Sequence, residues 1–123
     1  MRVYSFEKLA AWGKARVLTL DIYNITKSFP SSEKFGLVSQ MRRCSISVSS
    51  NLAEGSSRTS FKDQAHFTQL SYSSLLELLN QLILALDLEF INENQYKNLR
   101  NKMEELSAIL NALRKSQLNK LNS

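Results

Sequence analysis

Apolar residues recur at every third or fourth position in four separate stretches of the chain, which is the spacing of one face of an α-helix. The regularity is clearest near the C-terminus, where a seam of heptad spacing runs through Leu99, Met103, Leu106, Leu110 and Leu113. Three glycines and one proline leave little material for the tight turns of an all-β fold. The spacing predicts helices over about residues 5–28, 37–54, 61–88 and 93–115, with a frayed tail at 116–123.

Short connections separate the predicted helices, and each has a start or stop signal. Ser5 is a suitable N-cap for the first helix, and Pro30 ends it because proline disfavours helical geometry in the residue before it. Gly55 is the expected C-terminal stop of the second helix, while Ser60 and Asn92 begin the third and fourth as capping residues. This arrangement predicts a single domain, residues 1–123, that is an all-α, antiparallel up-down-up-down four-helix bundle.

The second predicted helix carries two neighbouring faces. One is apolar, as expected of a surface that faces a core, and contains Leu37, Met41, Cys44, Val48 and Leu52. The other, here called the polar stripe, contains Gln40, Arg43, Ser47, Asn51 and Glu54. Residue types alone leave it open whether this stripe is a buried network, an interface or a ligand site. Glu54, and Glu77 of the third helix, are expected to pair with a buried arginine, Arg43 being the nearest, because an unpaired buried charge is costly.

The sequence contains no residue pattern typical of an enzyme. The single histidine, His66, cannot supply the two Glu-x-x-His pairs of a di-iron bundle. Cys44 lies on the apolar face, where a thiol usually behaves as a small hydrophobe. Glycine-rich phosphate loops, dinucleotide fingerprints and nucleophile elbows are missing from the sequence. We therefore predict no catalytic residue, no cofactor and no metal ligand.

The sequence also predicts a cytoplasmic protein without a membrane span. The lone Cys44 cannot form an internal disulfide, and the first residues do not resemble a secretion signal. The most apolar stretch, residues 75–91, is interrupted by Glu77, Asn80, Gln81 and Asp87 before it reaches a spanning length of about 20 residues.

Charge is distributed unevenly along the chain. Residues 1–62 carry ten Lys or Arg and four Asp or Glu, residues 63–93 carry none and five, and residues 94–123 carry six and two. A basic surface of this kind attracts phosphates, or else it simply keeps the protein in solution. The candidates for sequence-tolerant phosphate contacts are Arg42, Arg58, Lys62, Lys97 and Arg100.

Residues around the second predicted helix resemble a known family. The matching positions are Phe29-Pro30, Glu33, Gly36-Leu37, Gln40, Arg42-Arg43, Ser47, Asn51-Leu52-Ala53-Glu54-Gly55 and Arg58, together with Phe6, Leu9, Trp12, Phe67, Ser74, Glu77 and Leu78. The family is the four-helix-bundle proteins encoded in intervening sequences of bacterial 23S ribosomal RNA genes. The chain has Ser71-Tyr72-Ser73-Ser74 where the family usually has Ala-x-Gly-Ser, so small residues are kept.

The resemblance implies a four-helix bundle that assembles as a ring-like homo-oligomer, foremost a pentamer, without enzymatic activity. The structural or assembly motif that follows consists of Gln40, Arg43, Ser47, Asn51, Glu54, Gly55 and Glu77. In that setting the polar stripe is best explained as a hydrogen-bonded seam from the second helix to the first and third, or to a neighbouring subunit. A related group serves as accessory factors to reverse transcriptases, and that function applies here by analogy alone.

Two functional hypotheses follow from these patterns. The leading one is a non-catalytic oligomeric module that binds RNA or another nucleic acid through basic surface repeated around the ring. The alternative is a protein-binding scaffold or adaptor whose charge is only solubilising.

Overall fold

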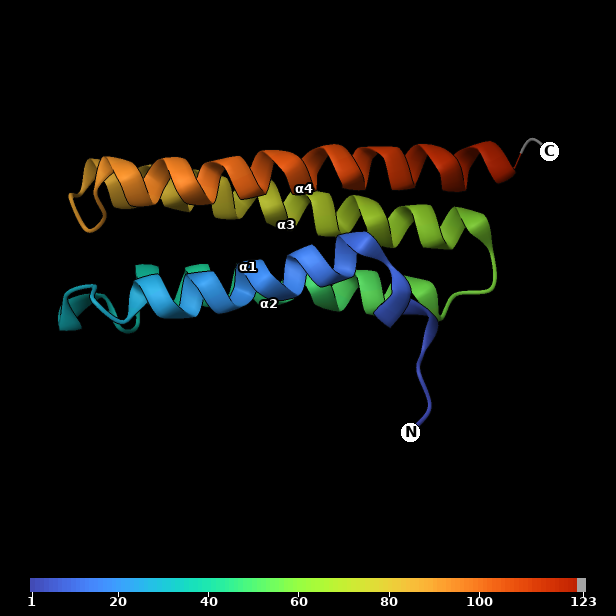
Figure 1. The fold of residues 1–123 in the computed structure, drawn as a ribbon, viewed down its shortest axis with the longest axis horizontal. Coiled ribbons are helices and arrows are strands. Elements are labelled where there is room, and N and C mark those ends of the chain that lie inside the picture. The colour runs from blue at the N-terminus through green and yellow to red at the C-terminus, as the bar shows by residue number, and fades with distance from the viewer. Residues whose placement is uncertain (122–123) are drawn as a thin grey trace.

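The structure, a computed structural model, describes residues 1–121 and contains four α-helices: α1 (Ala10–Thr26), α2 (Leu37–Ser56), α3 (Phe61–Asp87) and α4 (Glu93–Lys120). Two short 3-10 turns, η1 (Ser5–Lys8) and η2 (Ser31–Glu33), precede α1 and α2. Consecutive helices run antiparallel in two layers, α1 beside α2 and α3 beside α4 (Figure 1). Residues 1–121 contain no strand. The predicted all-α four-helix bundle is confirmed.

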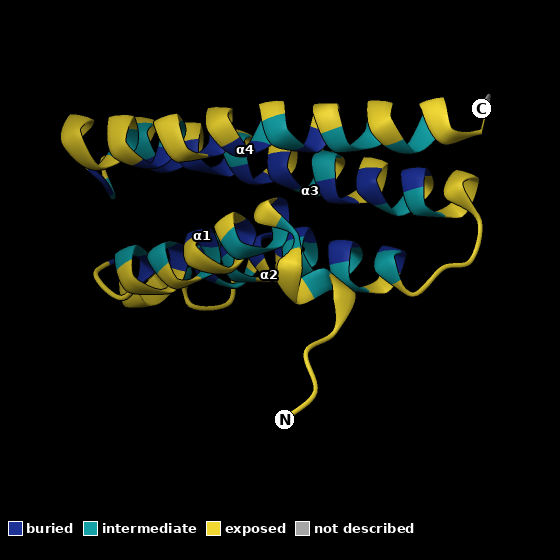
Figure 2. Ribbon diagram, turned by 45° about the vertical axis from the view of Figure 1, so that its right-hand side comes forward, coloured by how far each residue is buried: buried dark blue, intermediate teal, exposed yellow. Residues whose placement is uncertain are grey.

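The core lies between the two layers, where the buried sides of the helices face one another (Figure 2). Its largest fully buried apolar side chains come from every helix and are Leu18, Ile22, Met41, Val48, Leu75, Leu78, Leu82, Met103, Leu106 and Leu110. The heptad seam predicted for the fourth helix is buried through its first four residues, and Leu113 is half-buried. The apolar periodicity therefore identified the interior face of α4 correctly, and also that of α2, where Met41, Cys44, Val48 and Leu52 are buried.

The starts of α3 and α4 are the expected capping motifs. The Ser60 hydroxyl accepts a hydrogen bond from the Asp63 N–H at 3.1 Å. At α4, the Asn92 side chain accepts from the Gln95 N–H at 2.8 Å, and the Gln95 side chain accepts from the Asn92 N–H at 2.9 Å. Each bond satisfies an N–H that the helix itself leaves without a partner.

The first helix is shorter than predicted. It begins at Ala10 and ends at Thr26, because Leu9 has an extended backbone (ψ 126°) that separates η1 from α1. Ser5 is not the N-cap of α1. It is the first residue of η1 instead. The N-terminus of η1 is capped by the Glu7 carboxylate, which accepts a hydrogen bond from the Tyr4 N–H at 3.0 Å.

The predicted end of the second helix at Glu54 is also wrong, because α2 continues through Gly55 to Ser56. A Cβ added at Gly55 would lie 2.7 Å from the Cβ of Phe67, closer than real side chains approach. Gly55 is therefore glycine because α2 and α3 meet there, and not because the helix has to stop.

The predicted frayed tail is helical over most of its length. α4 continues to Lys120, and the Thr68 hydroxyl of α3 donates to the Gln117 side chain at 2.7 Å. Half-buried Leu118 lies in the same final turns. Residues 122–123, the end of the predicted tail, lie outside the described residues.

Candidate nucleic-acid interface

The middle of the polar stripe connects α2 to α3. The hydroxyls of Ser47 and Ser74 are hydrogen-bonded at 2.8 Å. The Asn51 side-chain amide donates to both the carbonyl oxygen and the hydroxyl of Ser47, at 2.9 and 3.0 Å. Ser47 and Asn51 are half-buried, and the Ser47–Ser74 hydrogen bond contributes to the packing of α2 on α3.

The outer members of the polar stripe are exposed. Gln40, Arg43 and Glu54 all face solvent, and the expected pairing of Glu54 and Glu77 with a buried Arg43 does not form. Glu54 instead pairs with Arg58 one turn later, at 3.3 Å on the surface. Arg43 is exposed because it lies about 40° further around the helix than Ser47, away from α3. The structure brings together only the central part of the predicted motif.

The link from α2 to α1 uses residues outside the polar stripe. The Thr19 hydroxyl donates to the Ser45 carbonyl at 3.1 Å. The Arg42 guanidinium donates to the Thr26 hydroxyl at 3.0 Å and to the Tyr23 carbonyl at 3.4 Å, and lies 4.5 Å from the centre of the Tyr23 ring. This positioning role of Arg42 is not apparent from the sequence. An arginine that reaches the last turn of a helix is favoured by the helix dipole, but the sequence does not show which helix end it will meet.

Cys44 and Gln81 form a buried polar pair between α2 and α3. The Gln81 side-chain amide donates to the Cys44 sulfur at 3.4 Å, while the Gln81 carbonyl oxygen is buried without a partner. Burial raises the pKa of the Cys44 thiol above its ordinary value; the Gln81 hydrogen bond lowers it in part, and the Glu77 carboxylate raises it again.

Cys44 is accordingly expected to be unreactive in the native protein. Iodoacetamide at pH 8 should alkylate it more than about tenfold more slowly in the folded chain than in urea, because the thiol is both buried and protonated. Since the folded state holds the thiol proton more tightly, this group favours folding below the ordinary thiol pKa. That contribution is lost as the pH rises through the folded-state pKa. Equal alkylation rates in the two states, measured by mass spectrometry, would contradict the placement of Cys44.

The five predicted phosphate-binding residues do not form one patch. Arg58 contacts Glu54 and lies 4.7 Å from the centre of the Phe67 ring, whereas Arg100 donates to the Tyr96 hydroxyl and pairs with Glu104 at 3.0 Å. Lys62 and Lys97 are exposed, without an ion pair in residues 1–121.

The two free lysines lie toward opposite ends of the bundle. The bond between Thr68 and Gln117 sets the register of α3 against α4. At a rise of about 1.5 Å per residue, that register separates Lys62 from Lys97 by about 40 Å along the bundle axis. Along the bundle axis, Arg58 and Lys62 thus lie toward one end, and Arg42, Lys97 and Arg100 toward the other.

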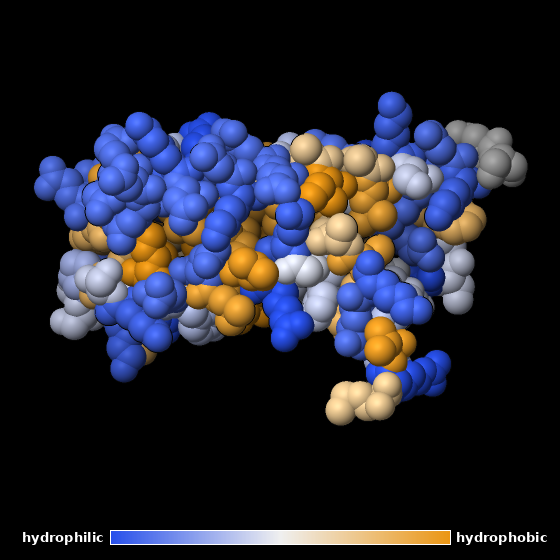
Figure 3. Space-filling view, viewed as in Figure 1, coloured by the Kyte–Doolittle hydropathy of each residue, from blue (hydrophilic) through white to orange (hydrophobic). Residues whose placement is uncertain are grey.

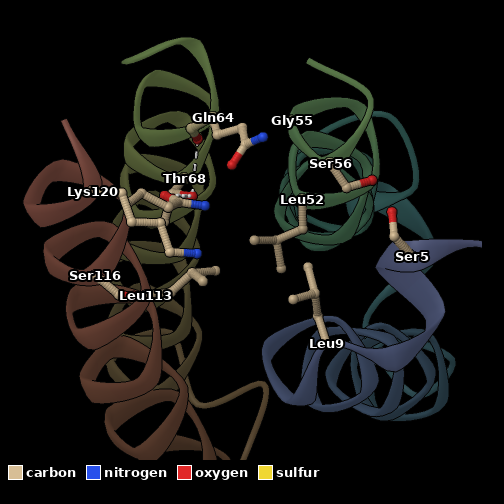
Figure 4. A pocket seen from close by; sticks show the side chains of 11 residues that line it. Ser5, Leu9, Leu52, Gly55, Ser56, Gln64, Thr68, Leu113, Ser116 and Lys120 are labelled. Carbon is tan, nitrogen blue, oxygen red and sulfur yellow. Dashed lines mark hydrogen bonds between the residues drawn. The ribbon is translucent and has the colours of Figure 1, made fainter. Parts of the chain in front are cut away.

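A cavity of about 240 Å³ opens at the end of the bundle where α2, α3, α4 and η1 meet (Figure 4). Leu9, Leu52 and Leu113 form its apolar part. Its polar lining is largely engaged by the fold, because Thr68 bonds to Gln117 and the Gln64 amide donates to the Arg58 carbonyl at 2.9 Å.

Metal-ligand clusters and membrane-spanning helices are both absent from residues 1–121. Within residues 1–121, no three His, Cys, Asp or Glu side chains gather as a set of metal ligands. Over the same residues, none of the helices combines the length and the apolar character that crossing a bilayer requires.

Comparisons with known proteins agree with this architecture. The chain matches the family model described as 23S rRNA-intervening sequence protein over residues 7–112. Among solved structures, it is similar to a protein of unknown function from the S23 ribosomal protein family of Bacteroides thetaiotaomicron. That structure aligns with a TM-score of 0.79 and 21% identity, over 85% of this chain and 95% of the other. At that identity the likeness concerns the fold. No curated protein matches the chain. Since the family model spans most of the sequence, the chain belongs to the 23S rRNA-intervening sequence protein family.

Proposed function

We propose that the protein is a non-catalytic, oligomeric helical module of the cytoplasm that binds RNA through its basic surface. The observation that carries the proposal is the separation of charge in the fold. Four of the five acids of residues 63–93 belong to α3 or to the connection to α4, and the fifth, Glu93, begins α4, while the remaining surface, which includes α2 and most of α4, has an excess of Lys and Arg. A surface of this kind attracts phosphates over distances of about a Debye length, about 8–10 Å in physiological salt.

Lysine side chains without an ion pair lie toward both ends of the bundle, which suits a long ligand that is bound regardless of its sequence. Lys62 and Lys97 are about 40 Å apart along the axis, which an extended RNA strand can span while a small anion cannot. Repetition of these contacts around a homo-oligomer, for which a pentamer is our proposal, raises the avidity for one RNA molecule without any strong single site. Ser47 of the polar stripe supports this role structurally, because its hydrogen bond with Ser74 helps to fix α2 against α3.

The free lysines give the most direct test of RNA binding. Lys62→Gln combined with Lys97→Gln is expected to weaken binding about equally for different RNA sequences, and to reduce the slope of log K against log salt by about two. Titration of a labelled single-stranded RNA at several salt concentrations measures both effects. Lysines are preferable to Arg42 here, because Arg42 also holds α1 against α2.

Lys102→Gln combined with Lys14→Gln is a matched control. It removes the same two charges, but from lysines that already pair with Asp21 at 2.8 Å and with Glu105 at 2.7 Å. If the control variant loses as much affinity as the test variant, net charge alone accounts for binding. If the wild-type protein does not bind RNA even at low ionic strength, the proposed function is wrong.

A protein-binding scaffold is the second candidate, favoured by one exposed aromatic residue. Phe35, in the connection between η2 and α2, is 88% exposed. Exposed aromatic side chains are enriched where proteins bind one another. Recovery of one defined protein by the wild type after nuclease treatment, and its loss with Phe35→Ala, would favour this function over RNA binding.

A further inference from the structure

Three aromatic side chains and two arginines form a continuous row from the N-terminal segment through η1 to the start of α1. The Tyr4 and Phe6 rings are nearly parallel, with 16° between their planes and 6.4 Å between their centres. The Phe6 and Trp12 rings meet edge to face, with their centres 5.1 Å apart. The Arg2 guanidinium lies 5.3 Å from the centre of the Tyr4 ring, and the Arg16 guanidinium lies 5.5 Å from the centre of the Trp12 ring. We call these five residues the aromatic row.

Packing of the bundle accounts for only part of the aromatic row. Trp12 is half-buried and lies against the core, and Phe6 is half-buried as well. Tyr4, in contrast, is 54% exposed, and Arg2 and Arg16 are exposed without an ion pair among residues 1–121. The N-terminal segment projects from the bundle and shows hydrophobic surface next to strongly hydrophilic surface (Figure 3). Aromatic and cationic groups are therefore held together where a ligand can reach them.

An open pocket of about 510 Å³ lies at the Trp12 end of the aromatic row, between α1 and α2. Phe6, Trp12 and Arg16 contribute to its lining, and Ser49 lines it from α2. Sites for small molecules in proteins typically have volumes of about 300–1,000 Å³. The pocket is therefore large enough to receive one flat ring system beside the indole of Trp12.

The polar groups of the pocket do not favour a small anion as its ligand. Glu7 also lines the pocket, and its carboxylate, which accepts from the Tyr4 N–H, offsets the charge of Arg16. The hydroxyls of Thr19 and Ser49 donate their protons to backbone carbonyls of α1 and α2, so they have none to donate to a ligand. The pocket thus offers aromatic surface and one guanidinium, which suits a flat ring that is held by stacking.

The surroundings of the pocket favour a polyanion that carries such rings. Arg2, Lys8 and Arg16 form no ion pair among residues 1–121, and neither does Lys62. Lys62 lies toward the same end of the bundle, because α1 starts where α2 ends and α3 begins (Figure 1). Single-stranded nucleic acids combine phosphates with unpaired bases. Proteins that bind them without sequence preference combine cationic surface with aromatic side chains on which the bases stack.

We propose that an unpaired base of single-stranded RNA stacks on Trp12 in this pocket, next to the Arg16 guanidinium. The strand continues along Phe6 and Tyr4, and the arginines at the two ends of the aromatic row contact its phosphates. Because the pocket has few hydrogen-bond donors, it accepts any base, as a sequence-tolerant module requires. The inference rests on the proposed function, and it adds a stacking site to a mode of binding that was argued from charge alone.

Trp12 is the only tryptophan of the chain, so intrinsic fluorescence reports directly on the proposed site. Full-length protein free of nucleic acid is titrated with oligoadenylate of about ten nucleotides, long enough to cover one binding site. Stacking of adenine on the indole should quench the fluorescence until binding saturates. An abasic strand of the same length carries the same phosphates without bases, and it should bind more weakly and without quenching.

Trp12→Leu tests the stacking through affinity, since leucine keeps an apolar side chain against the core. The affinity for oligoadenylate is expected to fall about five- to a hundredfold, while the affinity for the abasic strand should stay within about twofold. A variant that is only less stable would lose affinity for both strands alike. Fluorescence anisotropy of labelled strands measures the affinities of the wild type and the variant.

Arg16→Gln tests the cation beside Trp12 without changing the core, because Arg16 is exposed. The affinity for oligoadenylate should fall about two- to tenfold. Arg43→Gln is the matched control, because Arg43 is also exposed without an ion pair among residues 1–121 and does not line the pocket. Equal losses for the two variants would mean that general charge accounts for the effect and that Arg16 is not part of a site.

The outcomes separate the stacking site from the proposed function. Saturating binding of oligoadenylate without quenching, or equal losses for the two strands with Trp12→Leu, would overturn the stacking site and leave RNA binding intact. Quenching by a proline-rich peptide but not by oligoadenylate would also overturn it, and would assign the pocket to a protein partner. If neither strand binds at low ionic strength, both the stacking site and the proposed function are wrong.

Discussion

Leu78→Ala is expected to lower the free energy of unfolding by about 2–5 kcal/mol. Leu78 is fully buried in α3, the helix that packs on both α2 and α4, so the lost methyl groups leave a cavity where three helices meet. Urea denaturation followed by circular dichroism measures the change. The comparison requires equal protomer concentrations, because association between copies shifts the apparent stability.

Leu76→Ala is the matched control for Leu78→Ala. It makes the same substitution in the same helix, two residues away, where the side chain is 45% exposed. A change within about 0.5 kcal/mol is expected there, as for other surface substitutions. Equal losses for the two variants would mean that α3 does not present the face that the structure shows.

Gly55→Ala is expected to cost about 1–3 kcal/mol, even though alanine is the better helix former. The new Cβ would lie 2.7 Å from the Phe67 Cβ. Because that atom is fixed to the α3 backbone, α2 and α3 have to move apart to make room. Their separation would weaken the most extensive helix–helix contact of the bundle, including the Ser47–Ser74 hydrogen bond. Thermal melting at a fixed protein concentration measures the loss.

Ser50→Ala controls for helix propensity in the same experiment. Ser50 is exposed in α2, so the substitution brings the propensity gain of alanine without a clash, and stability should rise by up to about 0.5 kcal/mol. If Gly55→Ala also raised the melting temperature, Gly55 would be an ordinary interior position of α2, and the close approach of Phe67 would be wrong.

The helices that the sequence predicted best are those whose signals are local. α4 starts with a capping box and continues with a heptad seam, and both depend only on residues within one or two turns. The end of α4 was predicted too early because its last turns are held by tertiary contacts, such as that of Gln117 with Thr68. The sequence of a polar segment without apolar periodicity does not show that a side chain of another helix, far away in the chain, will form a hydrogen bond with it.

Single residues with two possible roles account for the other differences. Glycine ends helices and also permits close packing, and only the position of Phe67 distinguishes these roles for Gly55. Arg42 and Arg43 are neighbours in sequence but about 100° apart around α2, so one contacts the end of α1 while the other is exposed. The count of charged residues shows where Lys and Arg lie in the sequence, but it does not show which of them form ion pairs. The predicted phosphate contacts remain predictions.

The order in which the helices touch also bears on how the chain folds. Apart from the contact of α1 with α4, every helix pair in the bundle joins elements that are consecutive in sequence. Proteins dominated by such local contacts fold in microseconds to milliseconds, because little loop entropy is lost before stabilising contacts form. We therefore expect the α2–α3 hairpin to form early and α1 to dock on α4 late.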